Sequence, residues 1–110
     1  MDTKKVIIIT GASSGIGRAL SKEYANIDFK VVLVARRKDK LDELAADLSQ
    51  KTETLAVPTD ITNEEECKSM VEKVIDEFGR IDILINNAGI SMRAMFIDMK
   101  LDVMRKVMDV

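Results

Sequence analysis

A glycine-rich segment, Thr10-Gly11-Ala12-Ser13-Ser14-Gly15-Ile16-Gly17, follows the first apolar run of this 110-residue chain. Glycine permits positive φ and adds no Cβ that would block a closely approaching ligand. A helix that begins at this turn would offer free N–H groups and the positive end of its dipole, which both suit a phosphate. Ser13 and Ser14 could add hydroxyl donors. The segment therefore predicts a turn that binds the pyrophosphate of a dinucleotide.

The glycine spacing differs from two common nucleotide-binding motifs. The GxGxxG pattern fails because Leu20 stands three residues after Gly17, and the Gly-Lys-Ser/Thr of a P-loop is absent. A plain glycine turn without a ligand therefore stays open as an alternative. An apolar strand before the turn and a helical pattern after it favour nucleotide binding.

Two arginines follow the second apolar run, in Val34-Ala35-Arg36-Arg37-Lys38. Sites for NAD(H) usually carry a carboxylate here, which accepts a hydrogen bond from the ribose 2′-hydroxyl and repels a 2′-phosphate. Arginine does the reverse, because its planar donors match a phosphate. We therefore expect NADP(H) to be favoured, with NAD(H) possible, and Asp39 to cap the next helix. A solvated basic cluster is the alternative.

Polar residues also follow the third and fourth apolar runs. Asp60, next to Ile61, could accept a hydrogen bond from the amino group of an adenine, or it could be a turn-forming aspartate. Asn86 and Asn87 end the fourth run, where ligands of such sheets bind, and Gly89 would let the backbone approach a ribose. Turn chemistry again is the alternative, because Asn and Gly tolerate left-handed backbone.

Short apolar runs alternate with helical periods along the chain. The runs at 6–10, 31–34, 54–57 and 81–85 have the composition of buried strands. The first two helical periods place apolar residues on one face each: Ile16, Leu20, Tyr24 and Ile27 in the first, and Leu41, Leu44, Ala45 and Leu48 in the second. This alternation predicts an α/β fold, a Rossmann-type doubly wound parallel sheet.

Capping signals delimit a third helix. Thr62 and Glu65 have the spacing of a capping box, and Gly79 is expected to end the helix. A further helix is expected near the end of the chain, with Met104 and Met108 on its apolar face.

The composition excludes several classes of function. The net charge is −2 without a basic block, which argues against nucleic acid and anionic membranes as partners. The chain has one cysteine, Cys67, and no histidine, so we expect no disulfide and no metal site. A cytoplasmic location is expected, because the apolar run at 6–9 is too short for a signal peptide or a membrane span.

Taken together, TGASSGIG at 10–17, Asp60-Ile61 and NNAG at 86–89 resemble the N-terminal half of the short-chain dehydrogenase/reductase family. The resemblance implies that the pyrophosphate loop comprises Gly11, Ser13, Gly15, Ile16 and Gly17. It implies that Arg36 binds the 2′-phosphate of NADP(H) and that Asp60 and Ile61 contact the adenine. It also places Asn87, Ala88 and Gly89 at the adenosine ribose, with Asn86 steadying the central strands. Ser14 stands where many NADP-preferring members have a second basic residue, so the preference depends on Arg36 and Arg37.

The catalytic residues of that family have no counterpart here. Members use a Tyr-x-x-x-Lys pair and a serine, but the single tyrosine, Tyr24, is followed four residues later by Asp28 and lies on an expected core face. We therefore assign no catalytic residue. We expect residues 1–110 to be the dinucleotide-binding part of one domain, inactive alone, from a reductase or dehydrogenase acting on a small carbonyl or alcohol substrate.

Self-association is also expected, through the open edge of the strand at 81–85 and the exposed Met104 and Met108. Two alternatives stay open. One is a naturally short, non-catalytic protein that senses nucleotides or acts as a scaffold, and the other is an interaction module that binds no nucleotide.

Overall fold

A computed structural model of the chain describes residues 4–13 and 15–86. The chain order of the elements is β1 (Val6–Thr10), α1 (Gly15–Asn26), β2 (Lys30–Ala35), α2 (Lys38–Leu48), β3 (Thr54–Pro58), α3 (Glu64–Phe78) and β4 (Ile83–Asn86). The helix expected near the end of the chain lies outside these described residues. Within them, no helix is both long and apolar enough to cross a membrane.

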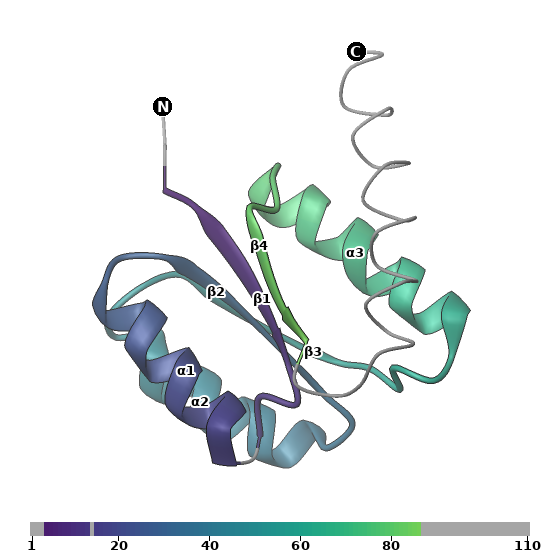
Figure 1. Cartoon of the computed structure of the whole chain (residues 1–110), viewed down its shortest axis with the longest axis horizontal. Helices are drawn as coiled ribbons and strands as arrows, with labels where there is room; N and C mark the ends of the chain where they lie inside the picture. The colour runs from purple at the N-terminus through teal and green to yellow at the C-terminus, as the bar shows by residue number, and fades with distance from the viewer. Residues whose placement is uncertain (1–3, 14, 87–110) are drawn as a thin grey trace.

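The strands form one parallel sheet in the order β3-β2-β1-β4. Helices α1 and α2 cover one face of the sheet and α3 covers the other (Figure 1). The chain builds the sheet outward from β1 through β2 to β3 and then crosses back to place β4 on the other side of β1. The predicted doubly wound α/β fold is therefore confirmed.

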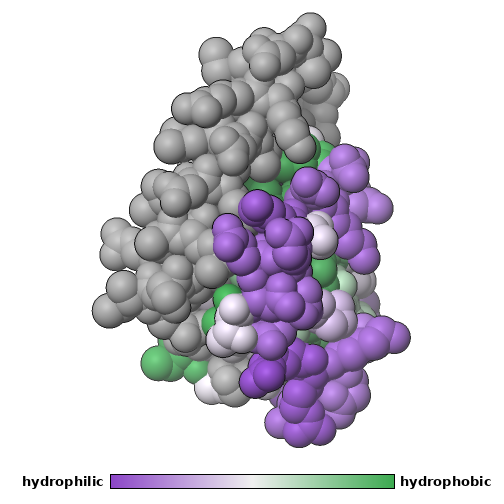
Figure 2. Space-filling model, turned by 90° about the vertical axis from the view of Figure 1, so that its right-hand side faces the viewer, coloured by the Kyte–Doolittle hydropathy of each residue, from purple (hydrophilic) through white to green (hydrophobic). Residues whose placement is uncertain are grey.

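Both faces of the central strands are buried, which explains their continuous apolar runs. All five residues of β1 and all six of β2 are buried. Alternate β1 side chains enter two different cores: Ile7 and Ile9 pack with the leucines of α2, and Val6 and Ile8 pack with Met70 and its neighbours on α3. The outward side of the molecule near α3 is largely hydrophilic in Figure 2, as expected for a helix that buries one face only.

The start of the fourth strand differs from the prediction, because β4 begins at Ile83 and not at 81. Asp82, the residue before β4, joins the starts of β1 and β4 by two hydrogen bonds to Val6. Its backbone N–H donates to the Val6 carbonyl at 2.9 Å, while its carboxylate accepts from the Val6 N–H at 2.8 Å. The adjacent Arg80 guanidinium donates to both oxygens of this carboxylate. The residues before Ile83 thus serve as a connection.

The apolar face predicted for α1 is partly wrong. Ile16 and Ile27 are 69% and 60% exposed, and Ile27 lies beyond the end of the helix. The side that packs most tightly consists of the small residues Gly17, Ser21 and Ala25. Ser21 fits because its hydroxyl donates to the Gly17 carbonyl at 2.7 Å. The predicted Leu20 and Tyr24 lie at the border of the core and are partly buried.

Both predicted N-caps are wrong by one or two residues, whereas the predicted C-cap is confirmed. Asn63, not Thr62, caps α3: its side chain accepts from the Glu66 N–H at 3.1 Å. Asp39 lies inside the first turn of α2, and the residue at the cap position is Arg37, which makes no side-chain cap bond. Gly79 ends α3 with a left-handed φ of 75°.

Candidate functional site

The loops that follow β1, β2 and β3 meet at the carboxyl edge of the sheet. They surround a hollow of about 250 Å³ whose lining residues are Gly11, Ser13, Ala35, Arg36, Arg37, Thr59 and Ile61. In open α/β sheets, ligands bind outside the carboxyl ends of the strands, beside the point where the strand order reverses. Here that point lies between β1 and β4. The structure thus brings the glycine turn, both arginines and Ile61 together around one hollow.

The glycine turn folds back tightly on the start of α1. Gly11 has a φ of 65° and Gly15 a φ of 44°, so both adopt left-handed backbone that glycine permits. A Cβ built on Gly17 would overlap the carbonyl oxygen of Gly11. A Cβ on Gly15 would meet no atom within 4 Å. Gly17 is therefore required for packing of the turn, while Gly15 leaves open space beside the first turn of the helix.

This geometry fits a phosphate group. The exposed start of α1 at Gly15 and Ile16 carries N–H groups that no preceding helical turn can satisfy, and the local backbone leaves room above it. Ser13 lines the hollow next to this helix start. Ser14 lies outside the described residues.

The two arginines each contact a carboxylate. Arg36 Nη2 lies 3.5 Å from Asp60 Oδ2, and Arg37 Nη2 donates to Asp39 Oδ2 at 3.1 Å. Both side chains remain mostly exposed, at 73% for Arg36 and 63% for Arg37. The hydrogen bond from Arg37 lowers the pKa of the Asp39 carboxyl below its usual value. Two cationic side chains therefore flank the hollow in positions that solvent and an anion can reach.

Asp60 occupies a turn between β3 and α3. Its Oδ1 accepts from the Thr62 N–H at 3.0 Å and from the Thr62 hydroxyl at 2.6 Å. These bonds, aided by the nearby charge of Arg36, lower the pKa of Asp60. The Asp60 N–H donates to Glu66 Oε1 at 3.1 Å. The observed contacts are those of a turn-forming aspartate, and contact of Asp60 with an adenine stays a prediction.

Sequence reasoning missed Thr59 and the partners of the arginines. Thr59 is buried, and its N–H donates to the Ala35 carbonyl at 2.9 Å, which holds the loop after β3 against the end of β2. Its position next to Asp60, just beyond the third apolar run, could have indicated it from the sequence. No sequence signal indicated that Arg37 would pair with Asp39, because an aspartate two residues after an arginine is common on any surface.

At the end of β1, the Thr10 hydroxyl donates to the Ile85 carbonyl at 3.4 Å. This bond ties together the two strands at which the order reverses. The main chain of Asn86 lies opposite Thr10 in the sheet. The predicted ribose-side residues Asn87, Ala88 and Gly89 lie outside the described residues.

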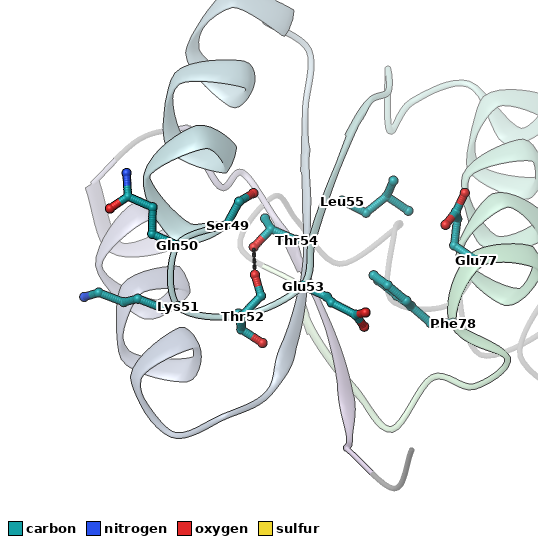
Figure 3. Close-up of a pocket in the computed structure, with 9 residues that line it drawn as sticks. All are labelled: Ser49, Gln50, Lys51, Thr52, Glu53, Thr54, Leu55, Glu77 and Phe78. Carbon is teal, nitrogen blue, oxygen red and sulfur yellow. Dashed lines mark hydrogen bonds between the residues drawn. The ribbon is translucent and has the colours of Figure 1, made fainter. Parts of the chain in front are cut away.

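A larger hollow, of about 560 Å³, lies at the opposite end of the sheet (Figure 3). It is lined by the segment 49–55, which runs from the end of α2 into β3, and by Glu77 and Phe78 at the end of α3. At its border, Lys30 Nζ lies 2.9 Å from Glu53 and 5.1 Å from the Phe78 ring centroid. Both adjoining helices end here, so their dipoles present partial negative charge. For a phosphate ligand the smaller hollow is therefore the better site despite its size.

Comparison with known proteins agrees with this fold. The family model described as short chain dehydrogenase matches residues 5–110. The chain is 46% identical over 99 residues to 11-beta-hydroxysteroid dehydrogenase-like 2 of Arabidopsis thaliana, covering 87% of this chain and 32% of that protein. It is 38% identical to human dehydrogenase/reductase SDR family member 7, covering 97% and 33%. The chain thus spans about a third of the length of these relatives.

Among solved structures, L-sorbose reductase from Gluconobacter frateurii, complexed with NADPH and L-sorbose, is similar with a TM-score of 0.75 and 44% identity. The similarity covers 79% of this chain and 34% of the reductase. An alcohol dehydrogenase from Thermococcus sibiricus, complexed with 5-hydroxy-NADP, has a TM-score of 0.71 and 34% identity, covering 74% and 35%. By its sequence motifs, its sheet and these comparisons, the chain belongs to the short chain dehydrogenase family.

Proposed function

We propose that this chain provides the adenosine-binding half of an NADP(H) site in an oxidoreductase. The observation that carries the proposal is the placement of Arg36 and Arg37 around the hollow beside the glycine turn. The L-sorbose reductase and the alcohol dehydrogenase named above are bound to NADPH and to an NADP derivative, which supports the same class of cofactor.

Each part of the site has a role under this proposal. The start of α1 at Gly15 and Ile16 binds the pyrophosphate through main-chain N–H groups, with Ser13 beside it. Ile61 and Asp60 border the adenine, and the two arginines bind the 2′-phosphate through charge-assisted hydrogen bonds. A bound NADPH supplies the hydride that a reductase of this kind transfers.

The whole protein, under the same proposal, reduces a small carbonyl compound or oxidises the corresponding alcohol. None of the described residues is assigned a catalytic role, so residues 1–110 alone are expected to be inactive. The relatives named above are dehydrogenases and reductases, which favours an enzyme over a non-catalytic sensor or scaffold. A cytoplasmic location belongs to the proposal as well.

Self-association is a further part of the proposal. Among the described strands, β4 pairs with β1 alone, so its other edge offers unpaired backbone groups. Light scattering at high micromolar concentration is expected to show a species larger than a monomer. A clean monomer at that concentration would contradict this part of the proposal.

Titration of NADP⁺ and NAD⁺ against arginine variants tests the cofactor assignment. Arg36→Ala and Arg37→Ala are each expected to weaken NADP⁺ binding about tenfold, because each removes a charge-assisted contact to the phosphate. NAD⁺ binding should change by less than about twofold, since NAD⁺ has no 2′-phosphate. Lys40→Ala is the control: Lys40 is exposed nearby on α2 but does not line the hollow.

Comparing the affinities for NADP⁺ and NAD⁺ separates the loss of a contact to the 2′-phosphate from a general loss of nucleotide affinity. Equal weakening of NADP⁺ and NAD⁺ by both arginine variants would refute the assignment of these residues to the 2′-phosphate. A wild-type chain that binds neither nucleotide would refute the proposed function itself.

A further inference from the structure

The two arginines of the site pair with aspartates that differ in how firmly they are held. Asp60, the partner of Arg36, is fixed in its turn by two hydrogen bonds from Thr62 and belongs to the loop after β3. Asp39, the partner of Arg37, lies in the first turn of α2, only two residues along the chain, and its side chain is 69% exposed. Asp60 therefore anchors its arginine from a fixed position, whereas the contact of Asp39 is local and open to solvent.

From this arrangement we propose that Asp39 is a specificity-determining residue, whose carboxylate competes with a nucleotide 2′-phosphate for the guanidinium of Arg37. The proposal rests on the proposed function, in which the arginines bind that phosphate. Both acceptors are anions that bind the same planar guanidinium donors. Arg37 lines the hollow, and its Nη2 already donates to Asp39 Oδ2 at 3.1 Å.

Competition lowers the affinity for NADP⁺ in two ways. The phosphate has to displace or share the Asp39 contact, and the Asp39 charge repels the phosphate. NAD⁺ meets neither effect, because it places an uncharged hydroxyl there. Asp39 thus sets how strongly the chain discriminates between the two nucleotides, and it weakens the preference that Arg37 creates.

The size of the effect follows from the exposure of the pair. Ion pairs between exposed side chains are worth little, and losing one corresponds to a roughly two- to fivefold change in an equilibrium constant. Removal of the Asp39 charge should therefore tighten NADP⁺ binding by about two- to fivefold. NAD⁺ binding should stay unchanged.

The chain offers a matched control for this experiment. Asp42 lies on the same helix and is also exposed, and it pairs with Lys38 at 3.7 Å. Lys38 does not line the hollow. Asp39→Asn and Asp42→Asn thus make the same chemical change to two neighbouring ion pairs, of which one includes a residue of the site.

Calorimetric titration of the full chain with NADP⁺ and NAD⁺ tests the proposal in the wild type, D39N, D42N, R37A and the double variant R37A/D39N. We expect D39N to raise the ratio of NADP⁺ to NAD⁺ affinity about two- to fivefold and D42N to leave it unchanged. In the R37A background, the effect of D39N should shrink, because the contested donor is gone and only the repulsion between the Asp39 charge and the phosphate remains. The NAD⁺ affinity of each variant reports whether its site has kept its fold.

The possible outcomes distinguish the two proposals. An unchanged or lowered affinity ratio in D39N, or an equal rise in D42N, would overturn the role of Asp39 while leaving the NADP(H) site in place. A D39N effect that persists in full without Arg37 would also overturn it. Failure of the wild type to bind either nucleotide would overturn the proposed function and this inference together.

Discussion

Replacement of Gly17 by alanine tests whether the glycine turn packs as the structure shows. The added Cβ would overlap the Gly11 carbonyl oxygen and lie 3.1 Å from the Ala12 Cα. Both are backbone atoms, so no side-chain rotation can relieve the overlap, and the turn has to move away from α1.

The expected loss of stability is the difference between two effects. Overpacking against rigid neighbours costs about 1–3 kcal/mol, and the absence of a flexible neighbour places this case at the upper end. Alanine in a helix interior is favoured over glycine by about 1 kcal/mol. The free energy of unfolding should therefore fall by about 1–2 kcal/mol. Because the turn shifts as a whole, NADP⁺ and NAD⁺ binding should weaken together, by about tenfold or more if about 1.4 kcal/mol of contact is lost.

Gly79→Ala provides the control for stability. Gly79 ends α3 with a φ of 75°, and a Cβ there would meet no atom within 4 Å. The left-handed backbone makes alanine unfavourable by about 1–2 kcal/mol, but the residue does not line the hollow. This variant should lose similar stability and keep nucleotide affinity.

Urea denaturation and nucleotide titration of both variants complete the test. If Gly17→Ala keeps the urea midpoint and both affinities of the wild type, the turn does not pack on α1 as described. If Gly79→Ala loses as much nucleotide affinity as Gly17→Ala, the loss reflects general destabilisation and not the turn.

Three further predictions concern the elements that support the site. Asp28 has a left-handed φ of 69°, so Asp28→Gly should stabilise the chain by about 0.5–1 kcal/mol in urea denaturation, and a lower midpoint would contradict this. Asn63→Ala should cost about 1 kcal/mol through loss of the bond from the Glu66 N–H, whereas a neutral result would show that the cap does not hold α3. Asp82→Asn should destabilise the chain at pH 7 by about 1–2 kcal/mol. Burial raises the pKa of the Asp82 carboxyl, but the bonds from Arg80 and from the Val6 N–H outweigh it and leave the pKa below its usual value. The stabilisation is therefore present above the unfolded pKa of about 3.9 and lost as pH falls through the lower folded pKa. Urea midpoints of wild type and variant should converge in that acid range, and a constant difference down to pH 2 would refute the role of the charge.

Much of the fold could be predicted from the sequence because its signals are local. The β-branched run at β1 and β2 indicates strands buried on both faces, and the helical periods between them require crossovers in a parallel sheet. Gly79 ends α3 as predicted, because the αL cap is a property of one residue. The glycine turn could likewise be predicted, because only glycine adopts the left-handed backbone of such a turn without strain.

Helix faces and caps were harder to predict, because neighbouring residues compete for the same place. Ile16 fits an apolar period but is exposed, and the fully buried side of α1 carries the small residues Gly17, Ser21 and Ala25. Thr62 fits a capping box, but its hydroxyl and N–H bind Asp60, and Asn63 caps the helix.

The sequence by itself determined the parallel sheet, the glycine turn and the presence of basic residues after β2, because periodicity, backbone freedom and charge belong to single segments. Only the tertiary structure decided that Arg36 meets Asp60. Arg36 and Asp60 lie 24 positions apart in the chain and approach to 3.5 Å only because β2 and β3 are neighbours in the sheet. The packing of the turn against α1 also decides that there is space beside Gly15 and that residue 17 must be glycine, because a Cβ there would overlap the Gly11 carbonyl oxygen. No local pattern specifies this packing.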